Sequence, residues 1–329
     1  MPTPIKVAIV GATGRIGSSG VPGLLNSKTP EYEIAALIRP ESFEKASSAA
    51  LRQRGVKTVP ADLQGSQEHL VSALTGQNVV ICILPPDSTL DQIPLANAAL
   101  KAGVKRFCSE RMGYFITAKR SHVDPRLEDV INHLKKIYLP YTVIDIGFWH
   151  EVMIPRIGSE KLNHVALYST SFFVDQGLAP CATTHIDDVG RFVARIIGDS
   201  RTINSLVFAY GEITNQKDVV QLVERLSGEK ADIMVVTSEQ VQKAVERHEL
   251  ELWPQVILEY AYNAWARGDN FPEKAKFLGY LDAKDLWPDL KAQTLEATIK
   301  EALANPQPNP GFGNDEKCAS IAEALRNWE

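Results

Sequence analysis

Two hydrophobicity patterns alternate along the first half of the chain. Short, nearly continuous apolar runs predict strands buried on both faces, and the stretches between them carry apolar residues at helical spacing. The strand-like runs are Val7–Val10, Ile34–Ile38, Val56–Val59, Val79–Leu84, Arg106–Cys108 and Thr142–Ile146. The helix-like stretches are Arg15–Asn26, Ser42–Arg54, Gln67–Leu74, Ile93–Ala102 and Leu127–Ile137. This alternation predicts an α/β fold with a doubly wound parallel sheet, whose ligand crevice lies at the carboxyl ends of the strands.

The pattern changes after Ile146. Residues 147–180 are rich in aromatic residues, Gly and Pro, which indicates loops or short strands. A strand is expected at Ser205–Tyr210, and the remaining apolar periodicity is helical. The expected helices are Asp188–Ile197, Lys217–Leu226, Ser238–Glu249, Trp253–Arg267, Leu290–Leu303 and Glu316–Trp328. We therefore expect residues 1–150 to form the sheet domain, completed by 181–210. Residues 151–180 and 211–329 would form a smaller, mainly helical substrate lobe.

A glycine-rich turn follows the first strand and opens the first helix. The segment Gly11–Gly17 reads GATGRIG, and this context places backbone N–H groups and the positive end of a helix dipole where a pyrophosphate can sit. Gly11 makes the tight turn, Gly14 lets a phosphate approach, and Gly17 lets the helix pack closely on the strand. The sequence therefore predicts a Rossmann dinucleotide-binding domain. The cofactor-binding residues predicted in this turn are Gly11, Thr13, Gly14, Arg15, Ile16 and Gly17.

Composition narrows the class of protein. The 329 residues are 44% hydrophobic and 23% charged, which is ordinary for a globular enzyme. A net charge of −5 and a pI near 5.9 argue against a nucleic-acid partner. No run reaches the ~20 apolar residues of a membrane span, and no secretory signal precedes the first strand, so a cytoplasmic protein is expected. The four cysteines and the histidines and carboxylates lack metal-ligand spacing, so we expect reduced thiols and no metal.

The second strand indicates which dinucleotide binds. NAD-binding proteins usually place a carboxylate at the end of this strand to bind the ribose hydroxyls. Here the strand ends Leu37–Pro40, without a carboxylate, and Arg39 offers a charged fork to a 2′-phosphate. Arg15 can add a second positive contact. The expected cofactor is NADPH, with the alternative that Arg39 is only an exposed residue at the strand end.

Several further motifs link the chain to a known family. They are LIRP at Leu37–Pro40, GVKTVPADL at Gly55–Leu63, AGVKRFCSE at Ala102–Glu110, LPYTVIDIGFW at Leu139–Trp149, DDVGRFVARII at Asp187–Ile197 and ARGDNFPEKAKFLGY at Ala266–Tyr280. With GATGRIG, they resemble the NmrA-like, isoflavone-reductase-like group of atypical short-chain dehydrogenases/reductases, in particular its fungal branch. The resemblance covers nearly the whole chain. It implies NADPH-dependent reduction of an aromatic metabolite, with hydride delivered to a conjugated or benzylic carbon.

The resemblance also implies cofactor contacts at the other strand ends. Asp62 would face the adenine, or it would serve a turn or helix cap. Ser109 would lie close to the nicotinamide. Further cofactor contacts are predicted at and just after the ends of the fourth and sixth strands. The alternative for the two prolines is that they only stop a strand, and the alternative for the aromatic residue is that it packs in the core. These residues are Leu84, Pro85, Pro86, Gly147 and Phe148.

The catalytic group is less well defined than the cofactor site. Many short-chain reductases use Tyr-x-x-x-Lys, but Tyr114 and Lys119 are five positions apart and would not face the same side of a helix. Tyr114 can still donate to a substrate oxygen, and Lys119 can contact the ribose or protonate substrate. His122 titrates in the useful range. All three are equally open to a plainer interpretation as wall or surface residues.

Two more candidates follow in the chain. The resemblance places the lysine of the plant reductases near Arg126, where an arginine can stabilise an oxyanion but cannot act as a general base. His150 follows the sixth strand and is a second histidine candidate.

We therefore expect an NADPH-dependent reductase of an aromatic or polyketide-like small molecule in fungal secondary metabolism, as a monomer or homodimer. The alternatives are an NADP-sensing regulator without turnover, or a non-redox isomerase, cyclase or lyase on the same fold.

Overall fold

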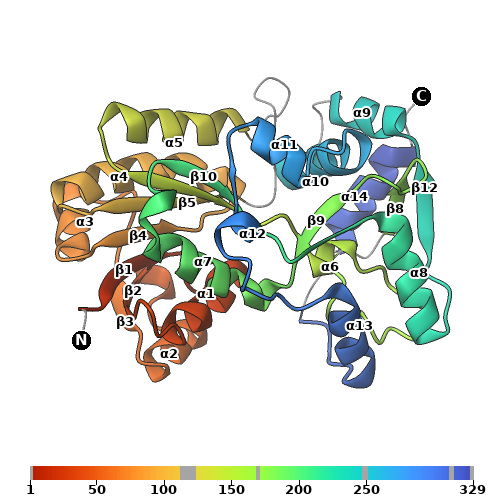
Figure 1. Cartoon of the computed structure of the whole chain (residues 1–329), viewed down its shortest axis with the longest axis horizontal. Coiled ribbons are helices and arrows are strands. Elements are labelled where there is room, and N and C mark those ends of the chain that lie inside the picture. The colour runs from red at the N-terminus through yellow and green to blue at the C-terminus, as the bar shows by residue number, and fades with distance from the viewer. Residues whose placement is uncertain (1–2, 112–123, 168–170, 247–250, 311–314, 327–329) are drawn as a thin grey trace. The chain divides into compact units, whose positions relative to one another are not determined.

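The computed structural model of the chain describes residues 3–111, 124–167, 171–246, 251–310 and 315–326. The chain forms two compact units, shown in Figure 1. Unit 1 comprises Met1–Arg111, Val123–Asp145 and Ile186–Ala209, and unit 2 includes Ile146–His185 and Tyr210–Glu329. Within the described residues, the chain passes from unit 1 to unit 2 between Asp145 and Ile146.

Unit 1 contains the predicted parallel sheet. Its strands lie in the order β3-β2-β1-β4-β5-β6-β10, and every described pair among them is parallel. From β1 the chain builds outward through β2 and β3, then returns to β4 on the other side of β1. The junction of β1 and β4 is therefore the topological switch point, where ligands bind in such sheets. The strands are β1 (Ile5–Val10), β2 (Tyr32–Ile38), β3 (Lys57–Pro60), β4 (Val79–Cys82), β5 (Arg106–Arg111), β6 (Tyr141–Asp145) and β10 (Ser205–Phe208).

Helices cover both faces of this sheet, which confirms the doubly wound fold class. On one face, Leu70, Leu95 and Leu134 bring three helices into a common core with the central strands. Two glycine-containing helices pack on the other face, and Figure 1 shows both layers. The first set is α3 (Gln67–Leu74), α4 (Gln92–Lys101) and α5 (Asp124–Lys136), and the second is α1 (Arg15–Leu25) and α7 (Val189–Gly198). Helix α2 (Ala46–Gln53) connects β2 to β3.

Helices α1 and α7 touch through their backbones. A Cβ built on Gly23 would lie 2.1 Å from the carbonyl carbon of Gly190, and one on Gly190 would lie 2.5 Å from the carbonyl oxygen of Gly20. Both distances are far below a van der Waals contact, so these glycines are needed for close approach. The contact holds the first helix of the unit against one formed much later in the chain.

The buried Arg106 holds the other end of α7. Its side chain is 5% exposed and donates at 3.0 Å to the carbonyl oxygens of Ile196 and Asp199 and at 3.2 Å to Thr202 Oγ1. Ile196 lies in the last turn of the helix and Asp199 is its C-cap residue, and carbonyls at this end lack intrahelical partners. A cation at this end also complements the helix dipole.

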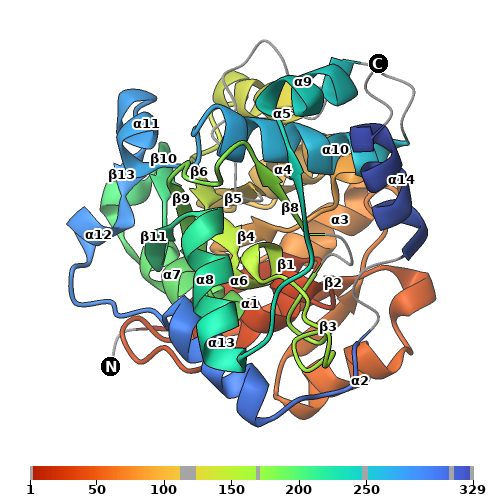
Figure 2. The same ribbon diagram turned by 90° about the vertical axis from the view of Figure 1, so that its right-hand side faces the viewer.

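Unit 2 is mainly helical but is not smaller than unit 1, contrary to the prediction. Its core gathers around Trp265, whose ring makes edge contacts with Phe148 at 5.4 Å and Phe172 at 5.6 Å between centroids. Figure 2 turns this unit toward the viewer. Its helices are α6 (His150–Met153), α8 (Gln216–Ser227), α9 (Ser238–Glu246), α10 (Leu252–Ala261), α11 (Pro272–Phe277), α12 (Ala283–Leu286), α13 (Leu295–Ala304) and α14 (Asp315–Arg326).

Short strands complete unit 2. One sheet has the order β11-β9-β7, and a parallel pair joins β8 to β12. Because β7 pairs with β9, the chain leaves the parallel sheet at Asp145, earlier than the sequence suggested. The strands are β7 (Phe148–Trp149), β8 (Ser171–Val174), β9 (Cys181–Thr184), β11 (Glu212–Thr214), β12 (Ile233–Val236) and β13 (Leu281–Asp282).

One predicted helix is divided. The expected helix over 253–267 is α-helical only to Ala261 and continues as a π-helix over Tyr262–Ala266. Among the described residues, no helix has the length and apolar character needed to cross a membrane.

The glycine contact between α1 and α7 can be tested with a matched pair of substitutions. Gly190→Ala should reduce the free energy of unfolding by about 1–3 kcal/mol, because its methyl group meets backbone that cannot move aside. Gly20→Ala adds the same methyl group with nothing within 4 Å, so it should leave stability unchanged or raise it by up to ~1 kcal/mol. Urea unfolding followed by far-ultraviolet circular dichroism measures both. Equal effects of the two substitutions would show that the close approach is not required.

Candidate active site

The glycine-rich turn adopts a conformation that requires its glycines. Gly11 has φ +83°, and a Cβ there would lie 2.0 Å from the carbonyl oxygen of Ile83, at the end of β4. A Cβ on Gly17 would lie 2.1 Å from the carbonyl oxygen of Gly11. The turn closes with a 2.9 Å hydrogen bond from Gly14 N to Gly11 O. The backbone of β1, the turn and α1 thus meet at the switch point with no side chain between them.

The start of α1 has no side-chain cap. Gly14 is the N-cap residue and supplies no side-chain cap, and the first turn contains no acidic residue. N–H groups at a helix start lack intrahelical acceptors and attract anions, aided by the helix dipole. Thr13 and Arg15 flank this position and are half-buried. A helix start of this kind is suited to a pyrophosphate. The contacts of the individual residues stay a prediction.

Two of the predicted cofactor-binding residues lie just after the ends of β2 and β3. The Arg39 side chain follows β2 and is 72% exposed, with Nε 3.2 Å from Glu41 Oε1. An exposed ion pair of this kind is weak, so the guanidinium stays available to a 2′-phosphate. Asp62 Oδ1 accepts a hydrogen bond from Gln64 N at 2.9 Å, so this carboxylate does serve a turn after β3.

Two polar groups lie just beyond the end of β4 and in the second half of β5. Pro86 starts the 3₁₀ turn Pro86–Asp91, and its carbonyl oxygen accepts from Arg126 Nη1 at 3.4 Å. Leu84 is half-buried and Pro85 is exposed. On the neighbouring strand, Ser109 is fully buried and its Oγ has no hydrogen-bond partner among the described residues.

The residues predicted after the sixth strand belong to unit 2. Gly147 has φ +64°, and a Cβ there would lie 2.7 Å from the carbonyl oxygen of Ala182 in β9. Phe148 is 2% exposed and its ring packs edge-on against Trp265. This aromatic side chain therefore fills the core of unit 2, the alternative that the sequence left open.

His150 is enclosed by neighbours of unit 2. Its side chain is fully buried, Nδ1 lies 2.9 Å from Thr298 Oγ1, and Nε2 lies 3.8 Å from Glu212 Oε1. Burial, together with the nearby His185 ring, lowers the pKa of His150 from 6.5 to about 3. The imidazole is therefore neutral at physiological pH and holds α6 to α13. A side chain in this state is poorly suited to donate a proton to a substrate.

Three of the predicted catalytic residues lie outside the described residues. They are Tyr114, Lys119 and His122. Within the described part of the chain, no group of three histidine, cysteine or acidic side chains is arranged to hold a metal ion.

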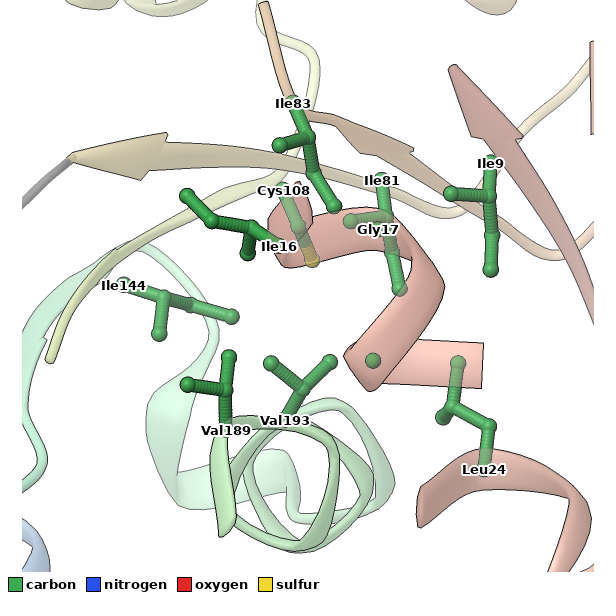
Figure 3. A pocket seen from close by; sticks show the side chains of 11 residues that line it. Ile9, Ile16, Gly17, Leu24, Ile81, Ile83, Cys108, Ile144, Val189 and Val193 are labelled. Carbon is green, nitrogen blue, oxygen red and sulfur yellow. The ribbon is translucent and has the colours of Figure 1, made fainter. Parts of the chain in front are cut away.

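A small apolar pocket of about 20 Å³ lies between the sheet of unit 1 and helices α1 and α7 (Figure 3). This volume is enough for a single water molecule, and the hydrocarbon lining offers it almost no polar partner. Burial raises the pKa of the Cys108 thiol to about 12, so this cysteine is not a nucleophile. The pocket is a packing space of the core. Its lining is Ile9, Ile16, Gly17, Gly20, Leu24, Ile81, Ile83, Cys108, Ile144, Val189 and Val193.

A second pocket lies in unit 2 beside α6, β8 and α8. At about 30 Å³ it has room for a few water molecules but not for an aromatic ring. Its lining includes Met153, Phe172 and Trp265, and the Gln216 amide is already bonded to the backbone at Phe172 and Val174.

Comparison with known proteins places the chain in a family. A model of the NmrA-like family matches residues 4–297. This chain belongs to the NmrA-like family. It is 40% identical over 312 residues to Asnovolin J 5′,6′-dehydrogenase of Aspergillus novofumigatus, covering 91% of this chain and 95% of that protein. It is 25% identical to a phenylcoumaran benzylic ether reductase of Betula pendula, covering 90% and 98%.

Solved structures of similar proteins share the fold. The complex of leucoanthocyanidin reductase with NADPH from Vitis vinifera matches with a TM-score of 0.78 at 20% identity, covering 91% of this chain and 100% of that one. The predicted family and fold class are thus confirmed for this NmrA-like protein.

Sequence reasoning passed over one buried charge in this NmrA-like chain. Asp145 is the last residue of β6 and is fully buried at the carboxyl edge of the parallel sheet. A carboxylate in such a place is costly to bury and marks a functional candidate. The signal was present as the one charged residue within the apolar run Thr142–Ile146.

The lowered pKa of His150 predicts that acid destabilises unit 2. In the unfolded chain this histidine takes up a proton below about pH 6.5, whereas the folded one stays neutral to about pH 3. Its contribution is complete above pH 6.5 and declines by about 1.4 kcal/mol per pH unit below it. Between about pH 7.5 and about pH 5 the loss should reach about 2 kcal/mol, and His150→Gln should remove that dependence.

Tryptophan fluorescence during urea unfolding measures this effect selectively. All five tryptophans fall in the ranges of unit 2, at Trp149, Trp253, Trp265, Trp287 and Trp328. The exposed His69 of unit 1 supplies the control, and His69→Gln should keep the wild-type pH dependence. The same pH dependence in the His150→Gln protein would contradict the assignment of a buried, neutral imidazole.

Proposed function

We propose that this protein is an NADPH-dependent oxidoreductase that acts on an aromatic or polyketide-like small molecule. Hydride would be delivered to a conjugated or benzylic carbon. The observation that carries the proposal is the 40% identity, along nearly the whole chain, to a protein named as a dehydrogenase. The relatives named as reductases of phenylcoumaran benzylic ethers and leucoanthocyanidin support an aromatic substrate.

The geometry of unit 1 supports a dinucleotide cofactor. The turn at Gly11–Gly17 leaves backbone N–H groups for a pyrophosphate, and a Cβ at Gly11 or Gly17 would collide with backbone. When bound, NADPH supplies the hydride. The protein's own task is to hold the dinucleotide along the carboxyl edge of the sheet, to orient the substrate and to stabilise the charge that develops on it.

The end of β2 supports NADPH over NADH. Arg39 presents a permanently charged planar fork, and it occupies the region where NAD-binding proteins place a carboxylate. Glu41 Oε1 lies 3.2 Å from Arg39 Nε, and both side chains are well exposed. A phosphate dianion offers a stronger partner than one exposed carboxylate, so the pair should open on binding.

Replacement of Arg39 tests this selectivity. Arg39→Ser should weaken NADPH binding by about 10- to 100-fold, which is the value of charge-assisted hydrogen bonds to a phosphate. NADH binding should change by less than about 3-fold, because NADH lacks the 2′-phosphate. Calorimetric titration with each cofactor measures both affinities, and oxidation of NADPH with candidate substrates separates an enzyme from a sensor.

The control is Arg54→Ser, which removes an exposed arginine of the same unit at the end of α2. It should bind both cofactors as the wild-type protein does. An equal loss for NADPH and NADH in Arg39→Ser, or no loss, would argue against a 2′-phosphate contact. Failure of the wild-type protein to bind NADPH at submillimolar concentration would refute the proposed function itself.

A further inference from the structure

Two lysines of unit 2 lie beside the same buried aspartate. Asp282, the last residue of β13, is 6% exposed, and its Oδ2 lies 3.3 Å from Lys276 Nζ. Its Oδ1 accepts a hydrogen bond at 2.8 Å from the backbone N–H of Lys284 in α12. Both lysines are exposed to solvent, so a reagent can reach either one. Their side chains nevertheless end in opposite surroundings.

Two carboxylates hold the ammonium group of Lys276. Its Nζ lies 2.9 Å from Asp285 Oδ2, in addition to its contact with Asp282. The hydrogen bond to Asp285, together with that to Asp282, raises the pKa of Lys276 above its usual value, because both favour the charged form. This lysine therefore stays protonated at neutral pH and is a poor nucleophile.

The amine of Lys284 lies against an aromatic ring instead. Its Nζ is 4.5 Å from the centroid of the Tyr210 ring. Tyr210 is 5% exposed, and its hydroxyl donates to Asp282 Oδ2 at 3.3 Å, so the ring is held in place. Within the described part of the chain, Lys284 Nζ forms no ion pair with a carboxylate.

The ring keeps water from one side of the Lys284 amine. This loss of hydration disfavours the ammonium form and lowers the pKa of Lys284. The charges of Asp282 and Glu212 oppose the effect without reversing it, whereas the charge of Lys291 adds to it. The attraction of the ring for a cation also opposes it, but this attraction is small at an exposed position. Lys284 therefore carries more neutral amine at neutral pH than Lys276 does.

We propose that Lys284 is an acylation site, which takes its acyl group from a thioester. The amine nitrogen attacks the carbonyl carbon of the thioester and forms a C–N bond. The C–S bond breaks, and the thiolate leaves with the electron pair and takes up the proton that the nitrogen releases. The carboxylates of Asp282 and Glu212 disfavour an acyl group that brings a further negative charge, and the ring suits an apolar one. Acetyl is the smallest group of this kind.

Acetyl-coenzyme A tests this site on the full-length protein, with Lys276 as the internal control. Mass spectrometry of proteolytic peptides measures the acetylation of each lysine over time. At about pH 8, Lys284 should react at least about threefold faster than Lys276, because the fraction of free amine rises about tenfold for each unit by which a pKa falls. The rate at Lys284 should also reach half of its plateau at a lower pH than the rate at Lys276.

Further measurements separate the folded site from the local sequence. In guanidinium chloride the surroundings of both lysines are lost, and the two should react at similar rates. Asp285→Asn removes one carboxylate that holds Lys276, so it should speed acetylation there without slowing it at Lys284. Equal rates in the folded protein, or an advantage of Lys284 that persists in guanidinium chloride, would overturn the site. The reaction needs no dinucleotide, so either result leaves the NADPH assignment unchanged.

Discussion

The close approach of backbone to backbone around α1 is the constraint on which the rest of unit 1 depends. Gly17 lies against the Gly11 carbonyl and Gly23 lies against Gly190, each at a distance that excludes a side chain. The first contact seats the start of the helix directly at the end of β1, without a side-chain cap. The second ties that helix to α7, which Arg106 holds at its far end. The position of the glycine turn and of the helix that follows it therefore depends on packing with α7 as well as on the local sequence.

Burial has different consequences for two polar side chains, one in each unit. In unit 1, Ser109 is buried without a hydrogen bond, and Arg126 reaches only a single described carbonyl. In unit 2, His150 is buried with Thr298 as a partner and is held neutral by desolvation. A group desolvated without partners is prepared for a ligand, whereas one desolvated with a partner contributes to stability.

Residue type and chain position were sufficient to predict the conformation of the glycine turn. A strand, a GATGRIG turn and a helix are adjacent in sequence, so their geometry is local and Gly11 could be assigned its turn in advance. The same reasoning was insufficient for Phe148 and His150. Both follow the sixth strand, but their surroundings come from Trp265 and Thr298, more than a hundred residues away. Sequence spacing alone does not distinguish a residue that lines a binding site from one that packs in the core of a second unit.

The sequence by itself determined the parallel α/β sheet, the glycine turn, the strand end that carries Arg39 and the family of the protein, because each depends on short-range order along the chain. Only the tertiary structure decided that the chain leaves the sheet at Asp145, that His150 is neutral and enclosed, and that Arg126 donates to the carbonyl oxygen of Pro86. These outcomes depend on strand pairing and desolvation, which are set by segments far apart in the sequence and are therefore invisible to local patterns.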